Sequence, residues 1–464
     1  PEIGLPGHLS HAGEITMVST ADGHFFRGPL FIYNSPKITI NKTSSSGAVF
    51  FADGEEGDRF LDTEDRLQSS SRLGSIIVSN TGGSVIDVTG TSRQGFDSDH
   101  IVFESTAEDA ATIKATNGRN FTPVAPNPED QTFSPIRGGV DFEGVSQEPN
   151  TTDITIKGAK TAIDLDNTLL TVDMASTSIT GSVSLKNSAH AIFGGISDDD
   201  HDALVAVVFK PEAYVDAEKL NSLEQLFNNQ GWNNQSLTFK GTEASPVAID
   251  LTNSHIIGNA VNIEVQAGTE DGRAISLISN STAAFLSKDL MTVKGSTNID
   301  GNATMSVLSQ GTFKFTGSIN NSGTLWIKAN SLVGTGENAG LTSNGDTTLN
   351  VRDAIVLGGD LSVQAGSLTL SPTTLALDGG AYVGQNASLS VNSPTVTFAD
   401  SIVVNSGTLS INANSLTGTG EQASLTSSGT TTLNVRDSIA LGGGLAVAQG
   451  SLSLRVYPIL CLLC

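Results

Sequence analysis

The chain has 464 residues, of which 48 are acidic and 24 basic, so its formal net charge at pH 7 is −24. Nucleic-acid binding and attraction to anionic membranes both rely on clusters of Lys and Arg, so this charge argues against both kinds of partner. Only 16% of residues are charged and 5% are aromatic, while 49 are Gly. A solvated acidic surface and calcium binding both remain explanations of the acidity.

Residues 1–150 predict an irregular β structure. Short runs that alternate apolar and polar residues, such as 37–40, 75–78 and 84–88, are separated by longer loops. Two of these loops are prominent, a charged one at 53–66 and a proline-rich one at 122–135. Side chains alternate between the two faces of a strand, so such runs indicate half-buried strands. The pattern is typical of solenoid turns with insertions, and residues 151–195 become regular again.

Residues 196–236 interrupt that regularity. Leu220, Leu223 and Phe227 stand at helical spacing within 216–228, and Gly231 follows as a stop signal. We expect a short helix in a loop that leaves one turn of the solenoid. The same insertion holds an acidic run, in which we expect either a calcium site or a solvated loop, because its spacing matches no defined calcium loop. The candidate ligands are Asp198, Asp199, Asp200 and Asp202.

The C-terminal half of the chain repeats itself. Residues 321–370 and 405–454 align without a gap and share 36 of 50 positions. Self-similarity at a set period is the signature of a solenoid or an array. Such a repeat, rich in Gly, Asn, Ser and Thr, is more typical of a stalk or a binding surface than of a catalytic pocket.

A shorter period lies within the long one. Strand-like runs open on Leu or Met anchors at steps of 20, 24, 19, 21, 20, 24 and 19 residues, a mean of 21. A unit of that size must stack on its neighbours to bury a face. The sequence therefore predicts a parallel β-helix with turns of about 21 residues and insertions in the N-terminal half. The anchors are Met305, Leu325, Leu349, Leu368, Leu389, Leu409, Leu433 and Leu452.

The expected organisation has three parts. Residues 1–239 form an irregular β-helix, residues 240–454 form the regular repeat, and residues 455–464 form an aberrant tail. The tail reads RVYPILCLLC where the first repeat copy continues SPTTLALDGG, and it holds the two cysteines, Cys461 and Cys464. Because apolar and polar residues no longer alternate there, the tail suggests a shift of reading frame near Arg455. The tail is too short to span a bilayer. The chain starts at Pro1 rather than Met and shows no signal peptide, so we expect that its beginning is missing.

Motifs for catalysis are missing. The sequence has no Gly-x-Ser-x-Gly elbow, no Gly-Lys phosphate loop and no His-Glu-x-x-His. The enzyme alternative is a β-helical polysaccharide lyase or glycoside hydrolase, which would use carboxylate pairs on one face. Asp164 and Asp166 are the best such pair, because their alternate spacing places both on one face of a strand. Trp326 is replaced by Ser410 in the second copy, so we expect Trp326 to face solvent.

The stretches SGTLSINANSLTGTG, SSGTTTLNV and GGGLAVAQGSLSL resemble the repeats of bacterial filamentous haemagglutinin-type exoproteins and autotransporter passengers. That resemblance covers about 240–454. It implies a right-handed β-helix, passage through an outer-membrane transporter, and display at the cell surface. It also implies adhesion to receptors or glycans of host or neighbouring cells. We therefore expect a surface protein that binds without catalysis, using chiefly the insertions 196–236 and 53–66, or else a structural stalk.

Overall fold

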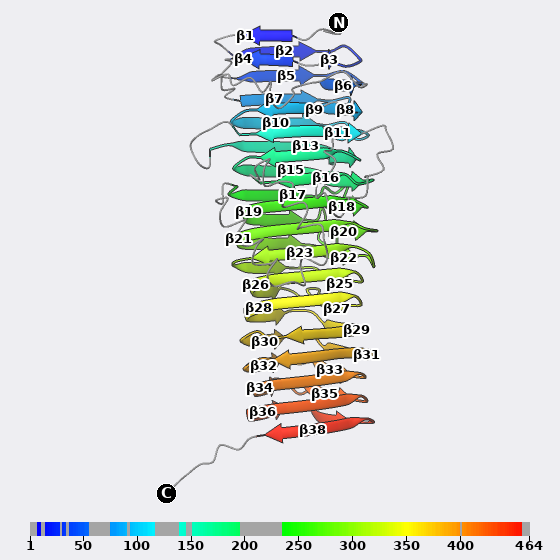
Figure 1. The fold of residues 1–464 in the computed structure, drawn as a ribbon, viewed down its shortest axis with the longest axis vertical. Helices are drawn as coiled ribbons and strands as arrows, with labels where there is room; N and C mark the ends of the chain where they lie inside the picture. The colour runs from blue at the N-terminus through cyan, green and yellow to red at the C-terminus, as the bar shows by residue number, and fades with distance from the viewer. Residues whose placement is uncertain are drawn as a thin grey trace, which may run out of the picture. The chain divides into compact units, whose positions relative to one another are not determined.

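The computed structural model describes residues 7–10, 14–27, 30–33, 37–54, 75–90, 93–116, 139–144, 151–194, 234–399 and 401–456. Within these ranges the secondary structure is all-β, with no helix. The chain divides into two compact units, Pro1–Thr269 with Asn280–Ala284 and Glu270–Ser279 with Phe285–Cys464. In each unit parallel strands stack turn upon turn, with about 22 residues a turn (Figure 1). The predicted parallel β-helix is confirmed.

The first unit contains the strands up to β19. They are β1 (Gly7–Ser10), β2 (Ile15–Ser19), β3 (Phe26–Arg27), β4 (Leu30–Tyr33), β5 (Ile38–Lys42), β6 (Phe50–Gly54), β7 (Ser75–Asn80), β8 (Ile86–Gly90), β9 (Arg93–Asp97), β10 (His100–Ser105), β11 (Ile113–Thr116), β12 (Gly139–Glu143), β13 (Asp153–Asp166), β14 (Leu169–Asp173), β15 (Ser176–Lys186), β16 (His190–Phe193), β17 (Ser236–Lys240), β18 (Ile249–Thr252) and β19 (His255–Gln266).

The second unit contains β20 and every later strand, except for the first residues of β21, which belong to the first unit. Its strands are β20 (Arg273–Ile278), β21 (Thr282–Lys294), β22 (Ser296–Ile299), β23 (Thr304–Ser309), β24 (Thr312–Phe315), β25 (Ile319–Asn321), β26 (Thr324–Gly334), β27 (Leu341–Ser343), β28 (Asp346–Leu357), β29 (Leu361–Leu370), β30 (Thr374–Leu377), β31 (Ala381–Asn392), β32 (Thr395–Phe398), β33 (Ile402–Asn405), β34 (Thr408–Gly418), β35 (Ser424–Ser427), β36 (Thr430–Leu441), β37 (Gly444–Val447) and β38 (Ser451–Val456).

The strands of the first unit form three parallel stacks, apart from the separate pair β1–β4. The first stack runs β2, β5, β7, β10, β13, β15, β17 and β19. The second runs β3, β6, β8, β11, β13, β15 and β18, and the third runs β9, β12, β14, β16 and β19. Long strands such as β13 bend from one stack into the next.

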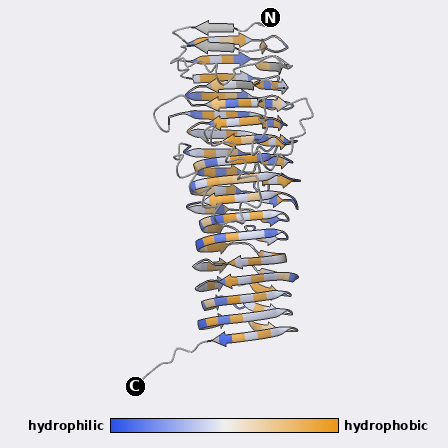
Figure 2. Ribbon diagram, in the orientation of Figure 1, coloured by the Kyte–Doolittle hydropathy of each residue, from blue (hydrophilic) through white to orange (hydrophobic). Residues whose placement is uncertain are grey.

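Alternation decides which side chains enter the core. In β10, Ile101 and Phe103 are fully buried while Val102 and Glu104 are half-exposed. Figure 2 shows the result as apolar and polar segments that alternate along single strands. The phenylalanine rings of the first unit gather inside it, with Phe96 packing against Phe103 and Phe142 at centroid distances of 5.2 and 5.5 Å. Burial of these large apolar surfaces is the main stabilising contribution.

Seven of the eight predicted anchors are buried, whereas Leu452 in the last strand is 38% exposed, and their stacking differs in part from the prediction. Leu325, Leu349, Leu368, Leu409 and Leu433 are each at most 5% exposed. Leu389 stacks on Leu409 in the neighbouring turn, as predicted. The two longest steps, which start at Leu325 and Leu409, are wrong as strand register. Leu325 pairs with Thr347, and Leu409 pairs with Thr431. The last step is wrong as well, because Leu433 pairs with Leu454 and not with Leu452.

Buried amides at one corner explain why a threonine can take an inward place. The Asn405 side chain donates to Thr430 O at 2.8 Å and Thr431 Oγ1 at 2.9 Å, and it accepts from Gly407 N at 3.0 Å. Asn321 makes the same contacts with Asp346 O, Thr347 Oγ1 and Gly323 N four turns earlier. Because its hydroxyl is hydrogen-bonded, the inward threonine adds little desolvation cost.

The duplicated blocks keep their core and vary mostly on the surface. All ten Leu and Ile residues of 321–370 recur in 405–454, whereas the 14 differences include Lys328/Asn412, Val333/Thr417 and Asp346/Thr430. These three pairs lie at exposed or half-exposed positions. Burial therefore constrains the repeat more strongly than surface chemistry does.

We predict that Leu409→Asp lowers the free energy of unfolding of the second unit by more than about 3 kcal/mol, because it places an unpaired charge in the core. The matched control is Ser410→Asp, since Ser410 is the half-exposed neighbour on the opposite face. Chemical denaturation followed by circular dichroism measures both. Equal effects of the two substitutions would contradict the assignment of inner and outer faces.

The corner amide gives a second prediction. Asn405→Ala leaves the Gly407 N–H and the Thr430 carbonyl without side-chain partners. We expect it to lower the free energy of unfolding by about 1–3 kcal/mol, the usual penalty for unsatisfied buried groups.

The control for this prediction is Asn412→Ala. Asn412 lies in an exposed ladder, where its side chain donates to Asn392 Oδ1 at 2.7 Å. Asn412 Oδ1 also accepts from Asn434 Nδ2 at 2.7 Å. Because Asn392 is exposed and Asn412 and Asn434 are half-exposed, water can replace these bonds, and the substitution should cost no more than about 0.5 kcal/mol. The same denaturation experiment compares the two variants, and a costlier Asn412→Ala would refute the corner role of Asn405.

Candidate functional site

The predicted calcium ligands cannot be placed. Asp198, Asp199, Asp200 and Asp202 lie outside the described residues, as do the predicted helix 216–228, the tail from 457 and most of the loops 53–66 and 196–236. Among the residues that the structure does describe, no three His, Cys, Asp or Glu side chains come together as metal ligands. In the same part of the chain no helix has the length and apolar character to cross a membrane.

The predicted pair Asp164 and Asp166 lies on the outer face of β13, as expected from its alternate spacing. The inward neighbours Ile163 and Leu165 are fully buried. Each carboxylate has a partner one turn on: Lys186 Nζ lies 3.3 Å from Asp164 Oδ1, and Asn187 Nδ2 donates to Asp166 Oδ1 at 2.9 Å. The pair therefore belongs to a network of charges and amides on the outer surface.

This network continues across the second stack. Asp87, Lys114 and Asp164 occupy matching positions on the adjacent strands β8, β11 and β13. Lys114 Nζ lies 3.4 Å from Asp87 Oδ2. We call these three residues with Lys186 the charged ladder. Opposite charges alternate along it, so the ladder brings carboxylates and amines together without a net charge.

An aromatic pair borders the charged ladder. Phe51 is the outward residue of β6 and stands beside Asp87 in the strand register. The ring of His24 stacks on Phe51 with centroids 3.7 Å apart and planes at 16°. The Ala48 N–H donates to His24 Nδ1 at 3.2 Å, so neutral His24 carries its proton on Nε2.

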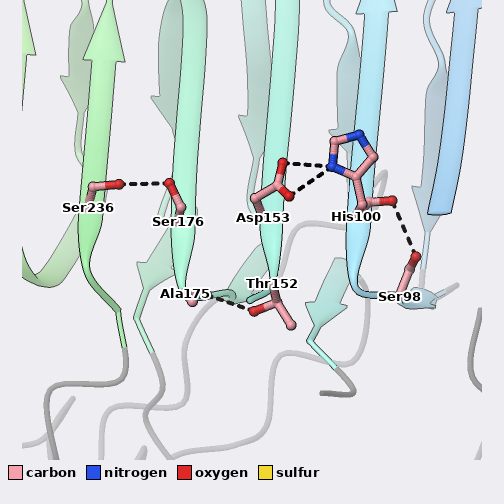
Figure 3. A network of polar contacts seen from close by, with 7 residues as sticks. All are labelled: Ser98, His100, Thr152, Asp153, Ala175, Ser176 and Ser236. Carbon is pink, nitrogen blue, oxygen red and sulfur yellow. Dashed lines mark hydrogen bonds and ion pairs between the residues drawn. The ribbon is translucent and has the colours of Figure 1, made fainter. Parts of the chain in front are cut away.

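The first stack carries a polar row where its strands begin (Figure 3). His100 Nδ1 lies 2.8 Å from both carboxylate oxygens of Asp153, and both side chains are about two-fifths exposed. Further along the row, the hydroxyls of Ser176 and Ser236 are 2.7 Å apart. Asp153 orients the His100 ring, because a carboxylate at Nδ1 selects one tautomer. In register, Ser75 is the neighbour of His100 on the other side.

A second histidine pair lies in the third stack. His190 and His255 are partners in adjacent turns, with ring centroids 4.9 Å apart and nearly perpendicular planes. Burial lowers the pKa of His255 to about 4. Removing the imidazole from water penalises its charged form, so His255 is neutral in the folded chain near neutral pH.

Lys42 is the one lysine among the described side chains that is completely buried. Its amine donates to Ser44 Oγ and to the Ser46 carbonyl. Burial lowers the pKa of Lys42, and the nearby Asp22 opposes that shift. Lys42 occupies the corner position that Asn80 takes in the next turn. Its role is to satisfy the backbone and side-chain acceptors of the turn.

The expectation that Trp326 faces solvent is wrong. Leu325 and Ile327 point inward, so alternation places Trp326 on the outer face of β26, yet only 5% of it is exposed. Alternation indicates the direction of a side chain, but it does not tell whether the outer face is covered. Trp326 is therefore not an open aromatic platform.

Comparison of the chain with models of protein families, with curated proteins and with solved structures gave no match. Function must therefore be inferred from the residues of this chain alone. Strand register assembles its charged ladder and aromatic pair on the second stack, and its polar row on the first. Sequence reasoning found Asp164 and Asp166 but missed their neighbours, since Phe51, Asp87 and Lys114 lie far apart along the chain.

We predict that the stability of the first unit falls as the pH drops from about 6.5 to about 4. His255 takes up a proton in the unfolded chain below its ordinary pKa of 6.5, whereas in the folded chain it does so only near pH 4. The loss should approach about 3 kcal/mol at pH 4 and below. Above pH 6.5 this group has no effect.

The measurement is the midpoint of chemical denaturation between pH 4 and pH 8 for the wild-type chain and His255→Gln. The variant should lose this part of the pH dependence. Ser254→Ala, next to His255, controls for local disturbance, because the Ser254 hydroxyl donates to Leu185 O and does not titrate in this range. An unchanged pH profile in His255→Gln would contradict the prediction.

Proposed function

We propose that the chain is a secreted or cell-surface β-helical adhesin or structural stalk of a bacterium, which binds without catalysis. Its partners would be receptors or glycans on host or neighbouring cells, with an outer-membrane transporter used during export. The observation that carries the proposal is that the inward and outward residues of each strand have different roles. Inward residues hold successive turns together, while outward residues present hydroxyls, amides and charges.

Two further features support a binding role. The outer face of the last turns carries Ser, Thr and Asn in matching columns, for example Ser390, Ser410 and Thr432. The duplicated blocks vary mostly at exposed positions, which is the behaviour of a surface whose chemistry can be changed without disturbing the fold. The absence of cysteine before Cys461 is compatible with export in an extended state.

A second candidate is a β-helical polysaccharide lyase or glycoside hydrolase. The charged ladder favours it, because carboxylates and amines gather on one outer face there. Asp164 and Asp166 would be the acid and base of such a reaction. Both carboxylates are engaged by Lys186 and Asn187, which equally fits a surface network.

One experiment separates the two candidates. The whole chain is tested for adhesion to cells and extracellular matrix, and it is incubated with neutral and uronic-acid polysaccharides whose shortening is followed by reducing-end release. We expect adhesion above that of an unrelated acidic protein and no release of reducing ends. Release that disappears in the Asp164→Ala, Asp166→Ala double variant would establish the enzyme instead, and absence of adhesion would refute the adhesin.

A further inference from the structure

The second unit carries an exposed apolar patch on the outer face of one strand stack. In this stack β27, β29, β31, β33 and β35 pair in succession. Tyr382 of β31 and Val404 of β33 are register neighbours on the outer face (Figure 1). Ile402 lies on the same face, two residues before Val404. Tyr382 is 40% and Ile402 41% exposed, and Val404 is half-exposed. We call these three side chains the apolar patch.

The fold does not require apolar side chains at these positions. Four turns earlier in the same stack, Asn298 and Asn320 occupy the places of Tyr382 and Val404. The parallel ladder therefore forms there with amides on its outer face. Apolar side chains that stay in contact with water contribute little to folding, but they gain free energy when a partner covers them. The apolar patch is accordingly a candidate interaction surface.

The Asp360 carboxylate lies at the edge of the apolar patch. Its Oδ1 accepts from the Gly380 N–H at 2.7 Å. The Tyr382 ring lies over Gly380, since a Cβ at that glycine would come to 3.0 Å from Tyr382 Cε2 and Oη. Asp378, in the turn that leads into β31, is exposed as well. No Lys or Arg occurs within 353–435, so the turns that hold the patch supply no cation to balance these carboxylates.

An apolar surface with a negative border selects the chemistry of its partner. A second copy of the chain would bring more negative charge, because the net charge of one copy is −24. A Lys or Arg of a partner can stand over the Tyr382 ring and face Asp360, so that a cation–π contact and an ion pair form together. The side chains of Ile402 and Val404 make no hydrogen bonds, so they suit an aliphatic side chain better than a sugar hydroxyl. A peptide segment with basic and aliphatic residues meets both conditions.

We propose that the apolar patch is a docking surface for a cationic, apolar segment of another protein. One Lys or Arg of that segment stacks on Tyr382 beside Asp360, and a neighbouring aliphatic side chain packs on Ile402 and Val404. The inference deepens the proposed binding function, on which it rests, by assigning the partner to the class of protein receptors. The patch is small and open to water, so we expect weak binding that salt weakens further.

The test measures binding of the whole chain to short synthetic peptides of equal length by fluorescence anisotropy. The probe peptide alternates Lys or Arg with Leu. In two comparison peptides, Glu replaces the basic residues or Ser replaces Leu. We expect the probe peptide to bind more tightly than both, and its affinity to fall as the salt concentration rises. No binding of the probe peptide, or equal binding of either comparison peptide, would overturn the proposal.

Matched variants show whether binding uses the apolar patch. Tyr382→Ser and Asp360→Asn should each weaken binding of the probe peptide by about threefold or more, the size of one exposed cation–π contact or ion pair. The controls are Thr342→Ala, on the same outer face two turns before Tyr382, and Asp346→Asn, an exposed carboxylate on β28. Both controls should bind as the wild type does, and thermal unfolding shows whether each variant folds. Equal binding by folded Tyr382→Ser, or equal losses in the controls, would count against the docking surface.

Light scattering and an array of neutral oligosaccharides test the other occupants. We expect a monomeric chain and no saccharide binding that depends on Tyr382. Self-association or saccharide binding that Tyr382→Ser abolishes would assign the patch to a second copy or to a glycan, and would overturn the proposal.

Adhesion of the same variants to cells and extracellular matrix distinguishes the two claims. If the whole chain and Tyr382→Ser adhere equally while the probe peptide does not bind, the adhesin proposal stands and the docking surface fails. If the probe peptide binds through Tyr382 and Asp360 but the chain does not adhere, the docking surface stands and the adhesin proposal fails.

Discussion

The in-register parallel ladder is the constraint on which everything else in each unit depends. Every strand must give its backbone hydrogen bonds to the turns before and after it, so a residue's nearest neighbours lie one turn away in the sequence. Side-chain chemistry is consequently arranged in columns. Leu389 meets Leu409 inside, and Asn412 bonds Asn392 outside. The core and the surface are two products of the same register.

Polar groups inside such a stack are tolerated where they close a corner. Asn321 and Asn405 each bind the backbone of the following turn, and Lys42 fills another corner, between Ser19 and Asn80 in the first stack. A corner bends the chain away from the ladder and leaves N–H and C=O groups that need partners. A buried amide or amine supplies them, so these residues stabilise the turn although they are polar.

The sequence was sufficient to predict the fold and the placement of residues within single strands of the site. It was not sufficient to predict which residues lie beside them on the adjacent strands. Alternation identified the buried anchors and placed Asp164 and Asp166 on one face, because both inferences need only local spacing. The inward Thr347 and Thr431 were missed, since a threonine at a core position makes sense only with the corner asparagine in view. The grouping of Phe51, Asp87 and Lys114 was missed because insertions of unequal length separate the strands that carry them.

The duplicated blocks have a consequence for how such a chain can change in length. Asn321 and Asn405 begin the two copies, and the strand register places them at the same corner, four turns apart. A gain or loss of the whole segment 321–404, from the start of one copy to the start of the next, therefore brings the backbone back to the same point of the coil, with an intact register on both sides. Recombination between the two copies would lengthen or shorten the solenoid in whole turns, whereas a deletion that cuts through a turn would force the residues after it to find new partners.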